Sequence, residues 1–214
     1  MRKVMSVFLA VGLAIVLAGP AAHAQKQSVF QLKVSPALPS ILPCLRRSST
    51  AVPSAGVIVG QGALADDLVI NVANIKPGLA FDLFTVQKSN ATPTGALDPN
   101  FKNFGLAWYQ TDLEANSSGQ IFATLHTILV NQIFGFDPDP LVKLAPTNTF
   151  HVGFWFNNPN DAVPCGFNAA KPTPFNGEHM AGPLAMISVP NATTKLGPLC
   201  LSPVFTGGVW KCNP

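Results

Sequence analysis

Charged residues are scarce in this chain. Lys, Arg, Asp and Glu together make up 11% of its 214 residues, less than half of the roughly 25% that is usual in a soluble domain. The formal net charge is +3, and no run of basic residues stands out. Proteins that bind nucleic acid concentrate Lys and Arg into such runs or patches. We therefore expect no nucleic-acid partner.

The common sequence signatures of catalysis are also missing. The chain has no G-x-S-x-G, S-x-x-K, Walker A, G-x-G-x-x-G or H-E-x-x-H sequence, and no EF-hand loop. Apart from His23, its histidines are His126, His151 and His179, so any histidine general base must be one of these three. No C-x-x-C spacing indicates a structural zinc site. This pattern favours a protein that is not an enzyme and has no cofactor.

An apolar run marks the N-terminus. Arg2 and Lys3 precede an apolar stretch over residues 4–18, and Ala-His-Ala follows at 22–24. This order predicts a bacterial secretory signal peptide over residues 1–24, cleaved near Ala24. The apolar stretch is too short for a comfortable membrane span. We expect a secreted or periplasmic protein with no transmembrane segment after cleavage.

The cysteines number four, and all follow the predicted cleavage site. An even number in an exported protein predicts two disulfides, for which four cysteines allow three pairings. We favour Cys200 with Cys212, because the residues between them predict a hairpin that turns at Gly207-Gly208. Cys44 would then pair with Cys165 and join an N-terminal arm to the main domain.

Proline is abundant, with 20 residues, and this argues against long helices. Short runs that alternate apolar and polar residues predict strands at 28–34, 104–110 and 147–156. We expect an all-β fold, an antiparallel β-sandwich of seven or more short strands that is Ig-like or jelly-roll-like. Residues 25–54 should form a first strand and a Pro/Ser-rich arm, and residues 55–214 the sandwich domain.

Further strands are expected between these. Residues 66–87 predict two strands joined by a turn at Lys76-Pro77-Gly78. Residues 120–130 fit either a strand or a short amphipathic helix, and the flanking turn residues favour the strand. Residues 183–190 and the C-terminal hairpin complete the set.

One face of the predicted strand 147–156 carries the first candidate site. His151, Gly153 and Trp155 alternate onto this face, opposite the phenylalanines. A glycine between an imidazole and an indole predicts a notch in which a ring-shaped ligand could stack on Trp155, and such a platform suits a carbohydrate. Alternatively, the glycine packs under a loop and Trp155 belongs to the core.

The loop "TPFNGEHMAGP", residues 173–183, carries the second candidate site. Glu178 and His179, joined by His151 from a neighbouring strand, could form a His/His/Glu set for zinc or copper. Asn176 is a further candidate ligand-binding residue. The alternative is that Asn176 caps a turn while the other two side chains hydrogen-bond to the loop.

Three N-x-S/T patterns begin at Asn90, Asn116 and Asn191. They match the acceptor pattern for N-glycosylation, but behind a bacterial signal peptide we interpret them as ordinary loop sequences.

Several blocks of the sequence resemble a group of uncharacterised bacterial secreted proteins. The blocks are "FDLFTVQ", "FGLAWYQTDLEANSSGQ", "FHVGFWFNNPNDAVPCGF" and "TPFNGEHMAGPL", which match patterns of the type WYQ-x-D, HxGxWF-N-x-P and TPFNGEH-x-AG over about residues 80–184. The layout is also similar to secreted β-sandwich domains of the chordin-repeat type. The resemblance implies secretion but brings no assigned activity.

Together these features predict an exported, disulfide-stabilised β-sandwich that acts as a non-catalytic binding or envelope-associated module. Its partner would be an envelope protein, a glycan or a small molecule. The first alternative is a metal-binding protein or metalloenzyme using His151, Glu178 and His179. The second is carbohydrate binding through Trp155.

Overall fold

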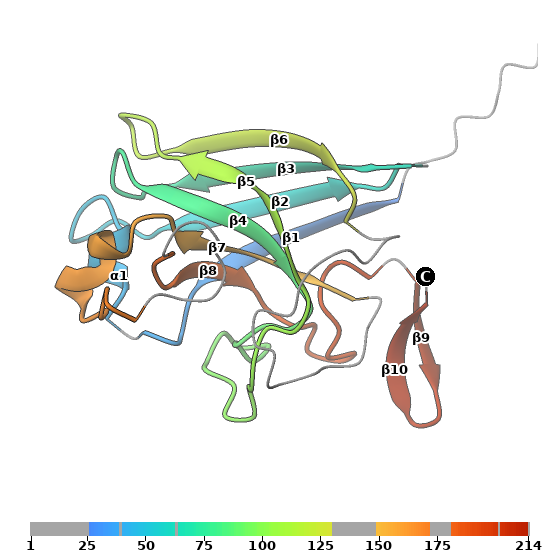
Figure 1. The fold of residues 1–214 in the computed structure, drawn as a ribbon. Coiled ribbons are helices and arrows are strands. Elements are labelled where there is room, and N and C mark those ends of the chain that lie inside the picture. The colour runs from blue at the N-terminus through green and yellow to red at the C-terminus, as the bar shows by residue number, and fades with distance from the viewer. Residues whose placement is uncertain are drawn as a thin grey trace, which may run out of the picture.

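The fold was analysed in a computed structural model that describes residues 26–38, 40–62, 64–129, 149–171, 181–200 and 202–213. It is all-β and antiparallel, as predicted, with eight strands in one sheet and two in another (Figure 1). The strands of the large sheet are β1 (Gln27–Val34), β2 (Ser54–Gly60), β3 (Asp66–Ala73), β4 (Ala80–Val86), β5 (Ala107–Glu114), β6 (Ile121–Thr127), β7 (His151–Phe156) and β8 (Leu184–Ser188). The small sheet consists of β9 (Ser202–Thr206) and β10 (Val209–Asn213).

The large sheet curls until it nearly closes into a barrel. Its strand order is β5-β4-β7-β8-β1-β2-β3-β6, so the edge strands β5 and β6 are consecutive in the sequence and joined by a turn. In that turn the backbone N–H of Asn116 donates to the carbonyl of Gln120 at 2.9 Å. Farther along, Thr127 Oγ1 donates to Gln110 Oε1 at 2.8 Å and bridges β6 to β5. Register shifts at 83/84 and 154/155 add local twist that favours this curl.

The inner face of the curled sheet encloses the main core. Alternation places Leu68, Ile70 and Val72 of β3 inside, with Phe81 of β4 and Phe154 of β7 across from them. The rings of Phe81 and Phe154 meet edge to face with centroids 4.9 Å apart. Because residues from both halves of the sheet share one cluster, the large sheet encloses one main apolar core.

A second, smaller apolar cluster covers the outer face of β4, β7 and β8. It contains Phe84, Val86, Trp155, Leu184 and Ile187, and the long connection between β4 and β5 packs over it. Strand β7 is therefore buried on both faces. This second layer positions the candidate site described below.

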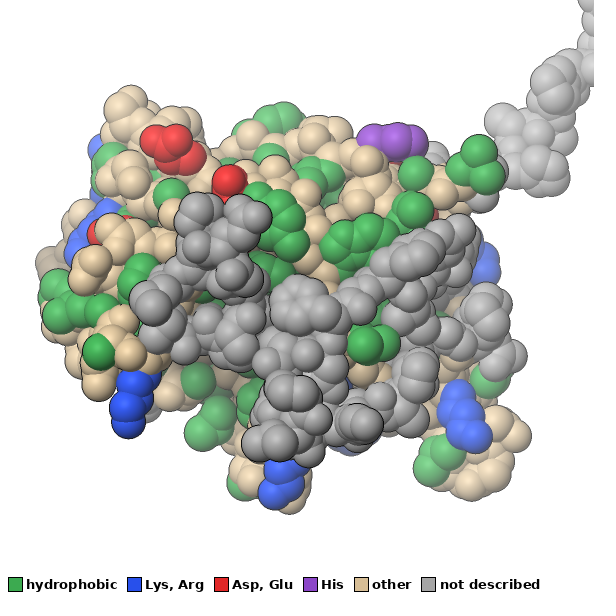
Figure 2. Space-filling model, in the orientation of Figure 1, with side chains coloured by type: hydrophobic (Ala, Val, Ile, Leu, Met, Phe, Trp, Pro, Cys, Tyr) green, Lys and Arg blue, Asp and Glu red, His purple; other side chains and the backbone are tan. Residues whose placement is uncertain are grey.

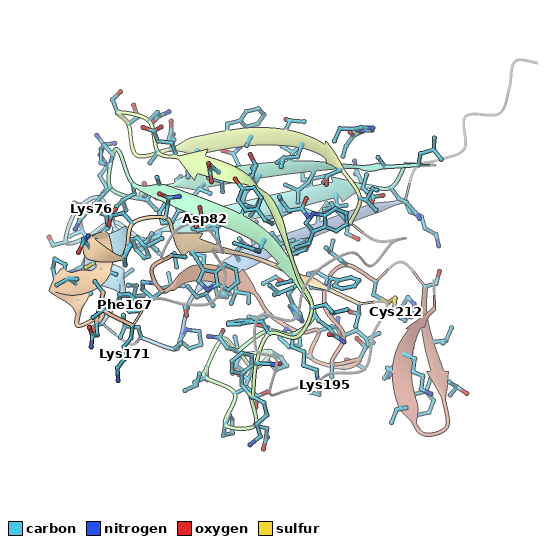
Figure 3. All side chains as sticks on the ribbon, viewed as in Figure 1. Lys76, Asp82, Phe167, Lys171, Lys195 and Cys212 are labelled. Atoms are coloured by element: carbon cyan, nitrogen blue, oxygen red, sulfur yellow. A yellow bond between two sulfur atoms is a disulfide. The ribbon has the colours of Figure 1, made fainter. Side chains whose placement is uncertain are left out.

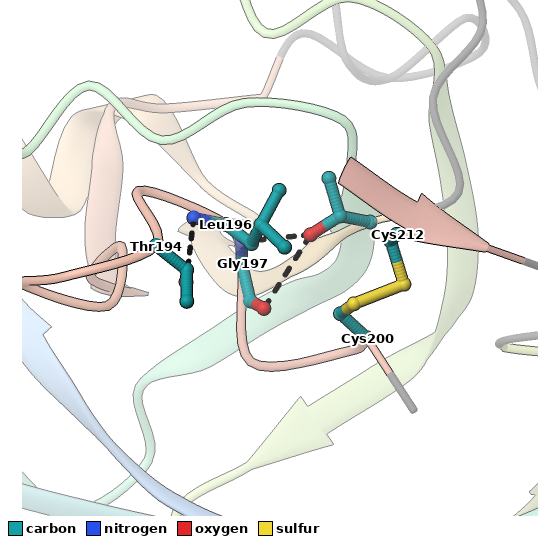
Figure 4. The surroundings of a disulfide bond; sticks show 6 residues. Thr194, Leu196, Gly197, Cys200 and Cys212 are labelled. Atoms are coloured by element: carbon teal, nitrogen blue, oxygen red, sulfur yellow. Dashed lines mark hydrogen bonds between the residues drawn. A yellow bond between two sulfur atoms is a disulfide. The ribbon is translucent and has the colours of Figure 1, made fainter. Parts of the chain in front are cut away.

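Two short helices lie together at one end of the sheet and carry one of the disulfides. Helix α1 (Leu42–Leu45) contacts the 3-10 helix η1 (Pro159–Cys165), and a disulfide joins Cys44 to Cys165. The second disulfide joins Cys200 to Cys212 at the base of the β9–β10 hairpin, next to a turn in which Leu196 N donates to Thr194 Oγ1 at 3.3 Å (Figure 4). Both pairings are the favoured ones.

The sequence pattern predicts where the strands lie along the chain more accurately than it predicts which strands pair with each other. The predicted run at 120–130 is indeed a strand, and the C-terminal hairpin turns at Gly207 and Gly208, which both have positive φ. The pair expected at 66–87 forms β3 and β4, but these strands do not pair with each other. β3 lies between β2 and β6, whereas β4 lies between β5 and β7.

Strand β5 begins later than expected, at Ala107, because Phe104 belongs to the preceding loop. Strand β1, expected to precede the domain, lies between β8 and β2 inside the sheet. Among the residues described, no helix is long and apolar enough to cross a membrane.

Candidate functional site

The predicted metal set is only partly described. Glu178 and His179 fall within residues 172–180, outside the described residues, so His151 is the one member of the set with a defined position. The ligand-binding candidate Asn176 falls within the same undescribed range. Within the described ranges, no group of three or more His, Cys, Asp or Glu residues could hold a metal ion.

His151 is a buried, neutral histidine at the start of β7. Its side chain is 4% exposed, and Nδ1 lies 3.1 Å from the carbonyl oxygen and 3.0 Å from Oγ of Ser188 on β8. The same Oγ accepts a hydrogen bond from the backbone N–H of Val152 at 3.1 Å. Burial lowers the pKa of His151 from 6.5 to about 4, and the hydrogen bond to the Ser188 backbone opposes this only in part. These contacts tie the imidazole to the β7–β8 pairing.

The predicted notch at Gly153 is filled by strand β8. A methyl group at this position would lie 3.1 Å from the carbonyl oxygen of Met186, 3.2 Å from Cγ1 of Ile187 and 3.3 Å from Cδ1 of Leu184. The glycine therefore lets β8 pack closely against β7 and leaves no room there for a ligand ring.

Trp155 is packed into the second apolar layer rather than presented as an open platform. Its side chain is 1% exposed. Its ring makes edge-to-face contacts with Phe84 and Phe104, with centroid distances of 5.4 and 5.2 Å. Phe104 in turn contacts Phe101 at 4.7 Å. A row of aromatic rings therefore runs from the outer face of β7 into the β4–β5 connection.

Next to this aromatic row lies a pocket with a volume of about 270 Å³. Four segments form it: the chain after β1, the β4–β5 connection, β7 with the start of β8, and the chain beyond η1. The last of these contributes Phe167, which is labelled in Figure 3. Its lining is mostly apolar and consists of Ala37, Leu38, Asn90, Leu97, Phe101, Phe104, Trp155, Phe167, Pro183 and Leu184.

The β4–β5 connection, residues 87–106, is held by its own hydrogen bonds. Gln87 pairs with Leu106 through the backbone at 2.9 Å, and its Oε1 also accepts from Leu106 N at 3.1 Å. Within the loop, Asp98 N donates to the carbonyl of Asn90 at 2.9 Å, and Ala91 bridges Leu97. These bonds give the loop a defined conformation, in which its apolar residues line the pocket.

Asn90 is the exception in this lining. It is 2% exposed, and its Oδ1 is the one buried side-chain oxygen or nitrogen without a hydrogen-bond partner among the described residues. Leaving a buried acceptor unpaired costs about 1–3 kcal/mol. Because this oxygen is closed to a molecule the size of water, a molecule in the pocket does not reach it, and its cost is one of packing alone.

The sequence contains little that could have identified this pocket. Asn90 stands in an N-x-T pattern in a turn-rich stretch, and nothing in the pattern indicates that its side chain is buried. The one available signal is the pair Phe101 and Phe104 in the loop sequence "LDPNFKNFG", because large aromatics in a loop usually pack onto something.

Three of the four sequence blocks of the predicted resemblance contribute adjacent strands, whereas most of the fourth block falls in residues 172–180, outside the described residues. β4 lies between β5, which carries "WYQTD", and β7, which carries "HVGFWF". On this surface Tyr109 donates to Asp112 Oδ1 at 2.8 Å. Asn157 Nδ2 donates at 2.8 Å to the buried Asp82, which is labelled in Figure 3. Burial first, and then Asp112, raise the pKa of Tyr109 to about 12. The first hydrogen bond lies within β5, and the second joins β4 to the residue that follows β7.

The chain matches no protein-family model, and comparisons with curated proteins and with solved structures likewise find no match. The resemblance to secreted bacterial proteins stays a prediction, and function has to be inferred from the pocket itself.

Proposed function

We propose that this protein is an exported binding module that takes up a small, mainly apolar molecule in the pocket beside Trp155. The observation that carries this proposal is the pocket's lining, in which Asn90 is the single polar side chain among ten residues. Small-molecule sites are typically concave and apolar with a few placed polar groups. The volume of about 270 Å³ is close to the lower end of the range for such sites.

The residues that line the pocket favour binding without catalysis. None of the ten lining residues carries a carboxylate, imidazole, thiol, hydroxyl or amine. The pocket as described therefore offers van der Waals contact and one amide, but no acid, base or nucleophile. In this proposal, the pocket is the binding site of the predicted non-catalytic module.

Export is supported by the disulfides. Two of them form among four cysteines, and the described residues contain no free cysteine. Disulfides persist in oxidising compartments, such as the periplasm or the medium. Together with the predicted signal peptide, they support a binding function outside the cytoplasm.

A carbohydrate ligand is disfavoured by the chemistry of the pocket. Sugar rings carry many hydroxyl groups, each of which needs a polar partner when buried, whereas this pocket provides one polar side chain. Figure 2 shows Lys and Arg side chains at several places on the part of this face that is not drawn in grey, and the pocket lining as described contains neither Lys nor Arg to bind an anionic ligand. Of the three residues in the metal hypothesis, only His151 lies within the described residues. The hypothesis stays a prediction.

A dye-binding experiment tests the proposal. N-phenyl-1-naphthylamine, which fluoresces strongly in apolar surroundings, should bind the purified protein saturably at one site. Leu97→Trp, at a half-exposed residue of the pocket lining, should fill the pocket and weaken binding at least tenfold. Leu64→Trp is the matched control, because Leu64 is 90% exposed and does not line the pocket. Unsaturable binding, or equal affinity in all three proteins, would refute the proposal.

A further inference from the structure

The β9–β10 hairpin stands apart from the large sheet (Figure 1). Among the described residues its two strands pair only with each other. A methyl group at Gly207 or Gly208, the two residues of the turn, would meet no atom within 4 Å beyond its chain neighbours. The turn therefore lies in open solvent, and the hairpin is a projection from the fold.

This projection carries exposed apolar side chains on both sides of its turn. Phe205 and Trp210 are cross-strand partners, and their ring centroids lie 5.4 Å apart. Such directly opposed residues share one face of a hairpin. Phe205 is 61% exposed, and Val209, next to the turn, is 51% exposed. Apolar residues scattered singly over a surface need no explanation, but a group of them on a short projection indicates a contact site.

The hairpin is stabilised in the conformation that exposes these side chains. An isolated two-stranded hairpin is at best marginally stable in water. Here the disulfide between Cys200 and Cys212 closes the base, and the aromatic pair adds a cross-strand contact. A binding surface that is ordered in advance loses little conformational entropy when it meets its partner.

The charge of this part of the chain indicates the kind of partner. Residues 181–214 contain Lys195 and Lys211 but no Asp or Glu, and both lysines are exposed. Lys211 lies in β10, and Lys195 belongs to the turn beside the disulfide (Figure 4). Exposed aromatic side chains next to positive charge match the interface of an anionic lipid bilayer, where Trp lies at the level of the headgroups and Lys is attracted to them.

We propose that the β9–β10 hairpin docks this protein on an anionic phospholipid bilayer. Phe205, Trp210 and Val209 enter the boundary between headgroups and acyl chains, and Lys211 stays among the headgroups. The apolar area that leaves water and the attraction to anionic lipid both contribute to such binding. Docking of this kind is independent of the pocket beside Trp155 and holds the proposed binding module at a membrane surface.

Sedimentation with lipid vesicles tests the proposal. The purified protein is mixed with vesicles of phosphatidylglycerol, which is anionic, or of phosphatidylcholine, which has no net charge, and the sedimented fraction gives a partition constant for each lipid. Phe205→Ser removes an exposed ring from the hairpin. Phe122→Ser is its matched control, because Phe122 is 70% exposed but lies on β6 of the large sheet. Lys211→Gln removes the charge of the hairpin, with Lys76→Gln, at an exposed turn, as its control (Figure 3).

We expect the wild type to bind phosphatidylglycerol about tenfold more tightly than phosphatidylcholine at low ionic strength. Phe205→Ser should weaken binding to phosphatidylglycerol about fivefold or more, and Lys211→Gln about fivefold. The two control variants should bind as the wild type does. If Phe205→Ser disturbs the hairpin through the loss of its contact with Trp210, Val209→Ser provides the same comparison without touching the ring pair.

Three results overturn the proposal. The first is that the wild type does not bind phosphatidylglycerol vesicles, and the second is that the hairpin variants bind no more weakly than their controls. The third is a dimer in sedimentation velocity that Phe205→Ser dissociates while no protein binds vesicles, because the hairpin would then contact a second copy of the chain. None of these results bears on dye binding in the pocket, so the proposed function is tested separately.

Discussion

The buried His151 makes the stability of this protein depend on pH in a defined direction. Burial lowers its pKa to about 4 in the folded state, whereas in the unfolded chain it titrates near 6.5. Between these values the unfolded state binds a proton that the folded state excludes. The free energy of unfolding therefore falls as the pH is lowered from about 6.5 to about 4, and the contribution is complete above 6.5. At about 1.4 kcal/mol per pH unit, the loss sums to about 3 kcal/mol.

The variant His151→Asn isolates this contribution. Asparagine keeps an amide that can hydrogen-bond to Ser188 but does not titrate. Urea unfolding, followed by tryptophan fluorescence, gives the free energy of unfolding of wild type and variant between pH 4 and pH 8. The wild-type value minus the variant value should rise by about 3 kcal/mol from pH 4 to pH 6.5 and then stay constant. Carboxylates titrate in both proteins, so the subtraction removes their effect.

A surface histidine provides the control. The side chain of His126 is 73% exposed and its Nδ1 lies 2.8 Å from Asp67 Oδ1. His126→Asn should retain the pH dependence that His151 causes. If the difference between wild type and His151→Asn is the same at every pH, the imidazole is not the buried neutral group described above and the reasoning fails.

Three further predictions follow from packing and from covalent links. Asn90→Leu removes an unpaired buried acceptor and should raise the free energy of unfolding by about 1–3 kcal/mol in urea. Gly153→Ala forces a methyl group to within 3.3 Å of three atoms of β8 and should cost about 1–3 kcal/mol, seen as a lower Tm. Gly56→Ala is its control, since the added group meets only the flexible side chain of Gln31. Replacing Cys44 and Cys165 by Ala opens a link across 121 residues and should cost about 4–5 kcal/mol, more than the loss of the hairpin disulfide, at about 3 kcal/mol.

For each of these three predictions, one result would contradict the reasoning. A lower stability of Asn90→Leu would mean that the oxygen has a partner in the folded chain. Equal Tm values for the two glycine variants would show that β8 can move away from β7 at little cost. A larger loss from opening the hairpin disulfide, which spans 12 residues, would contradict the loop-closure argument.

Residue order was enough to identify the local elements of this protein. Alternation in residues 147–156 separates Phe154 from Trp155, and the structure places them in different apolar clusters on the two faces of β7. The Gly207-Gly208 pair predicts a tight hairpin because both positions need positive φ. That hairpin in turn favoured one disulfide pairing out of three. All of these features depend on neighbours a few residues apart.

Tertiary structure decided everything that depends on distant neighbours. Strands β3 and β4 are joined by a short turn at Lys76-Pro77-Gly78, yet they lie in different parts of one curled sheet. The sequence of the turn does not indicate this. Spacing along β7 shows that Trp155 shares a face with Gly153, but only the packing of β8 and of residues 87–106 shows that this face is covered. The burial of Asn90 also depends on the tertiary structure, because segments that are remote in the sequence decide whether a side chain is buried or exposed. The sequence by itself determined which residues form strands and which face each side chain takes, and the folded chain decided which of those faces enclose a pocket.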